Sequence, residues 1–544
     1  MKVLVADALS EAGIEMLRKR GIHVDAKVGL NEDELVKIIV DYDGLIVRSA
    51  TKATRRILEA GKNLKVVGRA GVGVDNIDEA AATERGILVM NTPAGNTLSA
   101  AEHTMALLLS LARQIPQAAA SLRRGEWDRK TYAGVELAGK TLGIIGLGRI
   151  GREVASRAKA FQMRVVAFDP FISPEVAKEL SVELGAMEKL FAESDFLTIH
   201  TPLTQQTERL LGAAELAKMK KGARVLNVAR GGIVDEQALH DALKSGHLGG
   251  AALDVFQDEP PKNSPLLALA NFIGTPHLGA STQEAQEKVA LQVAEQVAEY
   301  LAEGKIANAV NLTVPPHPLI LPFIELTEHM GSFASQIGDG NPVEVHVECR
   351  GDVTKHNTHP IAVAGLAGVL SRASDERINL VNAEGKAKEH GLRLVHTQTT
   401  AIQDYTSSVR LTLKTNEGEV TLLGTHLARL GARVVEIQGF EVEFKPHGRF
   451  LVIQHRDQPG TIAKISSILG RENVNIAQMV VGRESARGKA FSILRVDDPI
   501  APAILDEIRK ALNVPNVRHV HIRKGGRSDA EAARPAAVAA KQTL

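Results

Sequence analysis

Three polar side chains, Arg230, Glu259 and His277, each follow an apolar run with the pattern of a buried strand, in NVARGGIVDE, LDVFQDEPP and GTPHLGAST. An imidazole exchanges protons near neutral pH, and a neighbouring carboxylate fixes its tautomer and raises its pKa. A guanidinium binds a carboxylate through two parallel hydrogen bonds. The three residue types therefore predict catalytic proton transfer on a small acid. His277 is the predicted acid or base, Glu259 its partner and Arg230 the anchor.

A glycine motif, GLGRIG at residues 146–151, lies between an apolar run and a helical pattern. Gly146 permits a tight turn, Gly148 lets the backbone approach a pyrophosphate, and Gly151 allows close packing of helix and strand. The helix that begins near Arg149 and Ile150 offers free N–H groups and the positive end of its dipole to the phosphates. The motif predicts a dinucleotide site.

Asp169 ends the next apolar run, 23 residues after Gly146. A carboxylate in this place accepts hydrogen bonds from ribose hydroxyls and repels a 2′-phosphate, which favours NAD over NADP. With NAD bound in the lobe that carries the three catalytic candidates, the predicted chemistry is hydride transfer between NAD and a hydroxy acid. His277 then takes the hydroxyl proton.

These residues need a scaffold, and the chain predicts two α/β lobes. Strand and helix patterns alternate from residue 1 to about 95, with five strands, and again from 141 to about 276, with six. A helix from Ser99 to about Arg124 is expected to connect the lobes, and a helix from Thr282 to Gly304 to return the chain to the first. The candidate residues then meet at the carboxyl ends of parallel strands, in one cleft.

Composition limits the other possibilities. The 544 residues include 65 Lys and Arg against 64 Asp and Glu, and this balance predicts no affinity for nucleic acid or an anionic membrane. The single Cys349 excludes an intrachain disulfide framework and a cysteine-rich metal site, so no metal is predicted. The N-terminus has the pattern of a strand and not of a signal peptide. We therefore expect a soluble, cytoplasmic protein.

The C-terminal half has a different pattern. The Pro-rich segment that begins at Val314 is typical of a domain boundary. Residues 318–446 are Gly-rich and predict a separate α+β domain, to which no site is assigned. Residues 449–524 have the order β-α-β-β-α-β of a ferredoxin-like fold. The tail 525–544 lacks large apolar residues and is expected to be disordered.

At this point the sequence resembles the D-isomer-specific 2-hydroxyacid dehydrogenases, and within them the long-form D-3-phosphoglycerate dehydrogenase family. The resemblance rests on GLGRIGREVASRAKAFQMRVVAFDP, NVARGGIVDE, ALDVFQDEP and TPHLGAST, in order and spacing. It implies a flavodoxin-like substrate-binding domain (1–97 and 289–315), an inserted NAD-binding domain (98–288), an intervening α+β domain (316–446), an ACT regulatory domain (449–524) and the tail (525–544).

The resemblance also assigns residues. It implies the roles of Arg230, Glu259 and His277 given above. The implied contacts to NAD come from Gly146, Gly148, Arg149, Ile150, Gly151, Asp169, Thr201, Val228, Ala229, Asp254, Leu278, Gly279 and Ala280. The implied contacts to a phosphorylated substrate come from Arg48, Ser49, Arg69, Gly71, Asn96 and Arg129.

The implied reaction is the oxidation of 3-phospho-D-glycerate to 3-phosphohydroxypyruvate, the first step of L-serine biosynthesis. Two alternatives stay open. One is a reductase of glyoxylate or hydroxypyruvate, although such enzymes lack the two C-terminal domains and have less need of several arginines. The other is a nucleotide-sensing corepressor on the same fold, which does not require His277.

In relatives that serine inhibits, the amino acid lies between two ACT domains. The contacting residues match His455, Asp457 and Asn475. A carboxylate can receive the ammonium group of serine, and an amide can receive its carboxylate. Other ACT domains only mediate assembly, so serine control stays an expectation. The resemblance further implies a homo-oligomer, most simply a tetramer with twofold interfaces.

Overall fold

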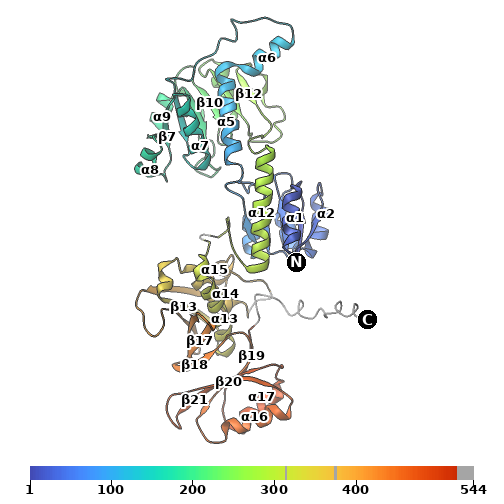
Figure 1. Cartoon of the computed structure of the whole chain (residues 1–544), viewed down its shortest axis with the longest axis vertical. Helices are drawn as coiled ribbons and strands as arrows, with labels where there is room; N and C mark the ends of the chain where they lie inside the picture. The colour runs from blue at the N-terminus through green and yellow to red at the C-terminus, as the bar shows by residue number, and fades with distance from the viewer. Residues whose placement is uncertain (313–314, 373–375, 523–544) are drawn as a thin grey trace.

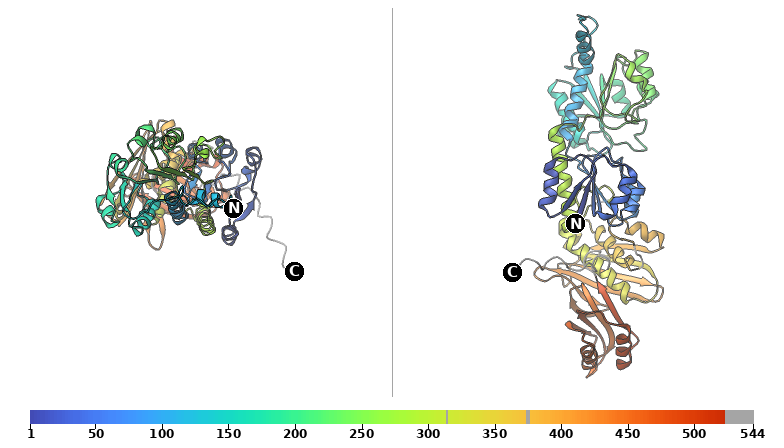
Figure 2. Two further views of the ribbon diagram at one scale, coloured as in Figure 1. Left: turned by 90° about the horizontal axis from the view of Figure 1, so that it is seen from above. Right: turned by 90° about the vertical axis from the view of Figure 1, so that its right-hand side faces the viewer.

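The computed structural model describes residues 1–312, 315–372 and 376–522, and these form four sheets arranged along one long axis (Figure 1). The NAD lobe and the α12 helix (Gln283–Glu303) occupy one half, and the intervening and ACT domains occupy the other (Figure 2). The predicted fold class is confirmed: two parallel α/β lobes precede a mixed α+β domain and a ferredoxin-like domain. Residue 314 and the tail 525–544 lie outside the described residues.

The substrate lobe has a five-stranded parallel sheet in the order β2-β1-β3-β4-β5. The five predicted strands are therefore confirmed. Its strands are β1 (Lys2–Val5), β2 (His23–Ala26), β3 (Gly44–Val47), β4 (Val66–Arg69) and β5 (Leu88–Met90). Its helices are α1 (Glu11–Lys19), α2 (Glu32–Ile38), α3 (Arg55–Ala60) and α4 (Glu79–Glu84).

The NAD lobe has a seven-stranded parallel sheet in the order β12-β11-β10-β9-β6-β7-β8. Six of its strands were predicted, and the seventh, β8, has only two residues. The strands are β6 (Thr141–Ile145), β7 (Arg164–Phe168), β8 (Glu183–Leu184), β9 (Phe196–Ile199), β10 (Arg224–Asn227), β11 (Gly250–Leu253) and β12 (Phe272–Gly274). The helices are α7 (Arg149–Ala160), α8 (Pro174–Glu179), α9 (Met187–Glu193), α10 (Ala213–Ala217) and α11 (Glu236–Lys244).

Two helical segments join the lobes. The return helix α12 is confirmed, because the Thr282 hydroxyl caps its first turn and Gly304 ends it in a left-handed conformation. The predicted helix 99–124 is wrong in one respect, since it is broken into α5 (Thr97–Arg113) and α6 (Ile115–Arg123). The break is at Gln114, which has a φ of 51°. Pro116 explains it, because a proline cannot continue the hydrogen-bond ladder of a preceding helix.

The intervening domain has a six-stranded sheet in the order β14-β13-β15-β16-β17-β18. Only the β13–β14 pair is parallel. The strands are β13 (Pro342–Gly351), β14 (Arg393–Thr399), β15 (Ser407–Thr415), β16 (Glu419–Leu427), β17 (Gly431–Ile437) and β18 (Phe440–Phe444). The helices are α13 (Leu321–Ile337), α14 (His359–Leu370) and α15 (Ala383–Glu389).

The ACT domain has the ferredoxin-like strand order β20-β21-β19-β22. Its elements are β19 (Gly448–Arg456), α16 (Thr461–Arg471), β20 (Ile476–Arg483), β21 (Lys489–Val496), α17 (Pro502–Leu512) and β22 (Val517–Ile522). One face of the sheet packs on α16 and α17. The other face joins the core of the intervening domain, where the buried Phe450 contacts Phe333 and Phe444 at ring-centroid distances of 5.8 and 5.3 Å. The two C-terminal domains therefore share one hydrophobic core.

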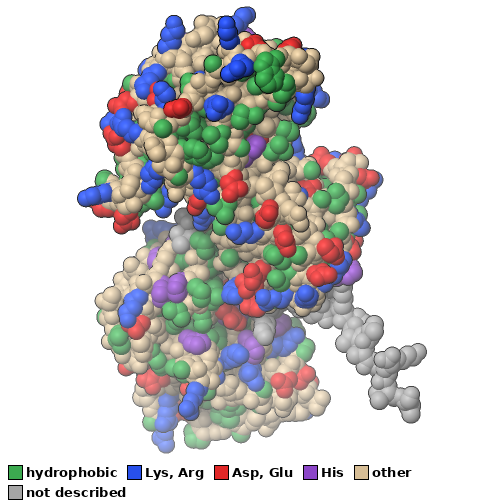
Figure 3. Space-filling view, turned by 45° about the horizontal axis from the view of Figure 1, so that its top comes forward, with side chains coloured by type: hydrophobic (Ala, Val, Ile, Leu, Met, Phe, Trp, Pro, Cys, Tyr) green, Lys and Arg blue, Asp and Glu red, His purple; other side chains and the backbone are tan. Residues whose placement is uncertain are grey.

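The surface agrees with the balanced composition. Lys and Arg side chains alternate with Asp and Glu over the visible face, without a large area of one sign (Figure 3). No helix in the described ranges is long and apolar enough to cross a membrane.

Candidate active site

The two N-terminal lobes meet at an ion pair. The Arg230 Nε atom, beyond the end of β10, lies 3.0 Å from the Asp75 Oδ2 atom of the substrate lobe. The guanidinium also lies against the backbone of that lobe, because a Cβ atom on Gly73 would lie 1.8 Å from its Nη2 atom. Sequence reasoning did not single out Asp75, although it lies in the segment GRAGVGVDNID that resembles a substrate loop of the family. The contact places Arg230 in the space between the lobes.

His277 and Glu259 form the expected pair. The His277 Nδ1 atom lies 2.8 Å from the Glu259 Oε2 atom. The hydrogen bond with Glu259 raises the pKa of the His277 imidazole, in spite of its partial burial. Burial by itself raises the pKa of the Glu259 carboxyl, but the hydrogen bond and charge of His277 outweigh burial and lower it. The pair therefore favours an imidazolium beside a carboxylate.

The three catalytic candidates follow the ends of neighbouring strands. Arg230 acts on His277 through its charge and opposes the rise in the pKa of that imidazole. The Arg230 side chain comes from the end of β10, and the loop of Glu259 and the loop of His277 follow β11 and β12. Because these strands are parallel neighbours, their carboxyl ends bring the three side chains together.

A buried carboxylate, Asp254, holds the His277 loop. Its Oδ1 atom accepts a hydrogen bond from the Leu278 N–H at 2.7 Å, and its Oδ2 atom accepts one from the Gly279 N–H at 2.8 Å. Its backbone carbonyl accepts from the His277 N–H at 2.9 Å. These bonds stabilise His277 at a φ of 55°, a conformation that non-glycine residues rarely adopt.

His103 completes this support and was missed by sequence reasoning. This histidine lies on α5, and its Nε2 atom lies 3.1 Å from the Asp254 Oδ1 atom. Burial raises the pKa of the Asp254 carboxyl, but bonds from His103, Thr275 and two backbone N–H groups lower it more. His103 stands within an ordinary helical pattern, so only the fold reveals its partner.

Arg69 of the substrate lobe is within electrostatic reach of Arg230 and of a second arginine of its own lobe, Arg48. Burial, and then the charges of Arg230 and Arg48, lower the pKa of the Arg69 guanidinium to about 10. Arg69 lies close to its own loop, since a Cβ atom on Gly71 would lie 1.7 Å from its Nη1 atom. Like charges gathered in a partly buried place favour an anionic ligand.

The other predicted substrate residues are distributed unequally. Asn96 occupies the N-cap position of α5 without a capping hydrogen bond from its side chain, and its Oδ1 atom is buried without a hydrogen-bond partner among the described residues. Ser49 follows β3 on an exposed turn, next to Arg48. The structure does not bring Arg129 to the other arginines, because its exposed segment follows α6 at the far end of the NAD lobe (Figure 1).

The glycine loop has the geometry that the motif requires. Gly146 has a φ of 94°, and a Cβ atom there would lie 2.6 Å from the His200 carbonyl. A Cβ atom on Gly151 would lie 2.1 Å from the Gly146 carbonyl oxygen, whereas Gly148 has open space at the first turn of α7. Open space next to free N–H groups suits a phosphate.

Asp169 and Thr201 lie beside this loop. The Asp169 carboxylate accepts hydrogen bonds from the Leu147 N–H at 2.7 Å and the Phe171 N–H at 2.9 Å. The Thr201 Oγ1 atom is buried and has no partner among the described residues. The remaining residues predicted to contact NAD surround the same strand ends: Arg149, Ile150, Val228, Ala229 and Ala280.

Comparisons with known proteins agree along the chain. Residues 105–279 match the NAD-binding domain of D-isomer specific 2-hydroxyacid dehydrogenases, 319–438 the intervening domain of D-3-phosphoglycerate dehydrogenase and 449–513 the ACT domain. The chain is 45% identical to D-3-phosphoglycerate dehydrogenase of Synechocystis sp., over 94% of this chain and 93% of that protein. The enzyme of the same name from Archaeoglobus fulgidus is 43% identical, over 96% of this chain and 100% of that protein.

The chain belongs to the D-3-phosphoglycerate dehydrogenase family. Solved structures resemble its N-terminal part. The TT0316 protein of Thermus thermophilus is 41% identical with a TM-score of 0.53, and covers 57% of this chain and 100% of its own. A glyoxylate reductase from Paecilomyes thermophila is 31% identical with a TM-score of 0.53, and the match covers 57% of this chain and 98% of that protein.

The residues of this D-3-phosphoglycerate dehydrogenase family member fit NAD. The glycine loop leaves room where a pyrophosphate would lie, the Asp169 carboxylate lies beside it, and the Thr201 hydroxyl is an unpaired buried group at the same edge. NAD is therefore the cofactor of the N-terminal half. The described residues include no group of three or more His, Cys, Asp or Glu side chains arranged to hold a metal ion.

The ACT residues matched to the serine site have partners within the domain. The His455 Nε2 atom lies 2.7 Å from the Ser492 Oγ atom, and this histidine is 7% exposed. Asp457 pairs with Arg483 at 3.3 Å. Asn475 donates through Nδ2 to the Asp497 carboxylate at 2.6 Å. A ligand at this place would have to share or replace these contacts.

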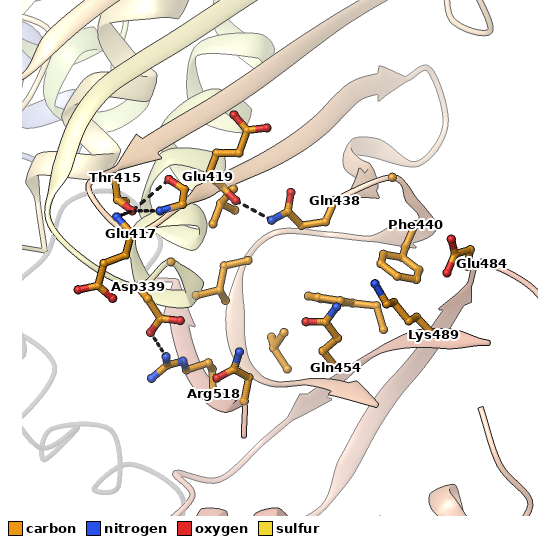
Figure 4. Close-up of a pocket in the computed structure, with 18 of the residues that line it drawn as sticks. Asp339, Thr415, Glu417, Glu419, Gln438, Phe440, Gln454, Glu484, Lys489 and Arg518 are labelled. Carbon is orange, nitrogen blue, oxygen red and sulfur yellow. Dashed lines mark hydrogen bonds and ion pairs between the residues drawn. The ribbon is translucent and has the colours of Figure 1, made fainter. Parts of the chain in front are cut away.

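A large cavity, about 840 Å³, is lined by residues of the intervening and ACT domains (Figure 4). Its polar lining mixes carboxylates such as Glu419 and Glu484 with Lys489 and the Arg518–Asp339 ion pair. None of the predicted site residues lines it.

Proposed function

We propose that this chain catalyses the NAD-dependent oxidation of 3-phospho-D-glycerate to 3-phosphohydroxypyruvate, the first step of L-serine biosynthesis. The observation that carries the proposal is the His277–Glu259 pair at the strand ends of the NAD lobe, within electrostatic reach of Arg230, which itself contacts the substrate lobe. Relatives that are 45% and 43% identical over nearly the whole chain bear the name of this activity.

The side chains have separate tasks. Arg230 binds the substrate carboxylate through its guanidinium. His277 takes the proton of the substrate hydroxyl through Nε2, since its Nδ1 faces Glu259. Glu259 stabilises the imidazolium that results. When bound, NAD supplies the acceptor for the hydride that leaves the substrate carbon. Closing of the lobes excludes water from the reacting groups.

A phosphorylated acid explains the extra positive charge. One guanidinium suffices for a carboxylate, but Arg69 is within electrostatic reach of both Arg230 and Arg48, and burial together with these two charges lowers its pKa. A phosphate dianion stabilises such a group. This favours phosphohydroxypyruvate over glyoxylate or unphosphorylated hydroxypyruvate. Arg129 can join them only by a rearrangement or from a second copy.

The regulatory and cellular parts of the proposal follow from the family. We infer inhibition by L-serine through His455, Asp457 and Asn475, a homotetramer, and a cytoplasmic location. We further infer the domain division 1–97 with 289–315, 98–288, 316–446 and 449–524. The match of residues 449–513 to the ACT domain supports an effector-binding role for the last domain.

The first experiment compares substrates. NADH oxidation is measured with phosphohydroxypyruvate, hydroxypyruvate and glyoxylate, with and without L-serine, in wild type, Arg69→Gln and the control Arg56→Gln. Arg56 is an exposed arginine of the same lobe that pairs with Asp33. We expect Arg69→Gln to lower kcat/KM for phosphohydroxypyruvate about tenfold to 100-fold, as for loss of a hydrogen bond to a charged group.

Arg56→Gln should keep the wild-type kcat/KM for phosphohydroxypyruvate, and Arg69→Gln should change kcat/KM for the unphosphorylated acids little. Wild-type efficiency with hydroxypyruvate or glyoxylate equal to that with phosphohydroxypyruvate would contradict the phosphorylated substrate. NADH binding without turnover of any acid would favour the corepressor.

A further inference from the structure

A short turn of the intervening domain, residues 376–382, lies against the substrate lobe. Arg377 donates through Nη1 to the Leu64 carbonyl at 2.6 Å. Asn379 donates through Nδ2 to the Gly86 carbonyl at 2.8 Å. In Figures 1 and 2 the intervening domain lies on the side of the substrate lobe away from the NAD lobe. The contact is therefore near the amino ends of β4 and β5, on the side of the lobe away from the NAD lobe.

The fit at Gly86 is close. This glycine has a φ of 63°, and a Cβ atom there would lie 2.9 Å from the Asn382 Nδ2 atom and 3.2 Å from the Asn379 Nδ2 atom. Asn382 also holds the shape of the turn, because its Nδ2 atom donates to the Arg377 carbonyl at 2.8 Å. The turn is thus built to fit this one place on the lobe.

The contacted carbonyls precede the strands that lead to the substrate residues. Leu64 lies two residues before β4, which ends in Arg69, and Gly86 lies two residues before β5, which leads to Asn96. At about 3.3 Å per residue the distance from Leu64 to Arg69 is about 16 Å. Val66 and Val67 of β4 are fully buried, so this strand can transmit a displacement along its axis.

A second contact comes from the chain that enters the intervening domain. The Asn311 Oδ1 atom accepts a hydrogen bond from the Val89 N–H at 2.8 Å. Its Nδ2 atom donates to the Ile87 carbonyl at 2.9 Å, and Ala309 pairs with Met90. Strand β5 is the edge of its sheet, and this linker covers that edge. The intervening domain is therefore connected to β5 at its beginning and along its side.

We propose that the 376–382 turn is a positioning contact, by which the intervening domain sets the affinity of the substrate site. Because the ACT domain shares a core with the intervening domain, a movement of either one displaces this turn relative to β4 and β5. The proposal rests on the proposed function for the substrate it names. Arg377 and Asn379 are its positioning residues.

The experiment uses the full chain with Arg377→Ala, Arg377→Lys and Asn379→Ala. Arg393→Ala is the control, since this exposed arginine of the same domain pairs with Glu344 and not with the substrate lobe. KM and kcat for phosphohydroxypyruvate, the Kd of NADH, and hydrogen exchange of residues 61–96 are measured. Exchange reports local opening independently of turnover.

We expect the two alanine variants to raise KM threefold to tenfold and to speed exchange in β4 and β5. kcat and the Kd of NADH should stay within twofold, Arg377→Lys should lie between wild type and Arg377→Ala, and the control should match wild type. Unchanged KM and exchange would overturn the proposal. A raised KM together with a lowered kcat and weaker NADH binding would also overturn it, because such a combination indicates general damage to the fold. If wild type lacks turnover, the proposed function fails, and the exchange comparison alone decides the contact.

Discussion

The two halves of the molecule join their domains in different ways. The N-terminal lobes meet at the Arg230–Asp75 ion pair, whereas the C-terminal domains share one hydrophobic core around Phe450. An ion pair with one exposed partner contributes little to stability, and a buried aromatic cluster contributes much. We therefore expect the N-terminal lobes to open and close, and the two C-terminal domains to move as one body.

The largest test of this contrast removes the proton acceptor. We expect His277→Ala to lower turnover about 10²–10⁴-fold, because general acid–base catalysis is lost. Fluorescence titration with NADH should give the wild-type affinity, since the glycine loop lies elsewhere in the lobe. Near-normal turnover in this variant would disprove the proposed mechanism.

The second test weakens the C-terminal half. Phe450→Ala should destabilise the intervening and ACT domains together by about 3–5 kcal/mol, the usual range for a buried phenylalanine. Calorimetry and hydrogen exchange should show both domains shifting in one transition. Phe171→Ala, at a phenylalanine of the NAD lobe that is 92% exposed, is the matched control. Separate transitions for the two domains would show that they move independently.

The smallest effect concerns the anion beside the imidazole. The raised pKa of His277 means that the imidazolium needed for ketone reduction persists to higher pH and is lost as the pH rises through that value. Glu259→Gln removes the negative charge beside His277, so the rate of ketone reduction should begin to fall at a lower pH than in wild type. At neutral pH this rate should be about tenfold lower. The rate of NADH oxidation as a function of pH measures both effects. Asp258→Asn, at the exposed neighbouring acid, should keep the wild-type profile, and an identical profile for Glu259→Gln would argue against the pair.

Local sequence patterns predict much of this architecture. The glycine loop and Asp169 lie within 24 residues, so their spacing alone predicts the turn that brings them together. Arg230, Glu259 and His277 follow three adjacent parallel strands, and the rule that ligands bind at carboxyl ends predicts their meeting. The alternation of strands and helices likewise predicts both lobes.

Other features depend on contacts that the sequence does not encode locally. His103 and Asp75 gain their partners only when α5 and the two lobes pack together. The two-residue β8 is too short to show a period, and the break at Gln114 comes from the proline two positions later. Arg129 lies on a segment whose path the sequence does not define. Such features need the tertiary structure.

The Arg230–Asp75 contact has a consequence for how an acid enters the cleft. The guanidinium is already neutralised by a carboxylate of the opposite lobe, so an arriving carboxylate exchanges with Asp75 and does not fill a bare charge. Each binding event then frees Asp75, which is largely exposed, to return to water. Binding of the acid therefore breaks one ion pair of Arg230 and forms another, and added salt should weaken both of them.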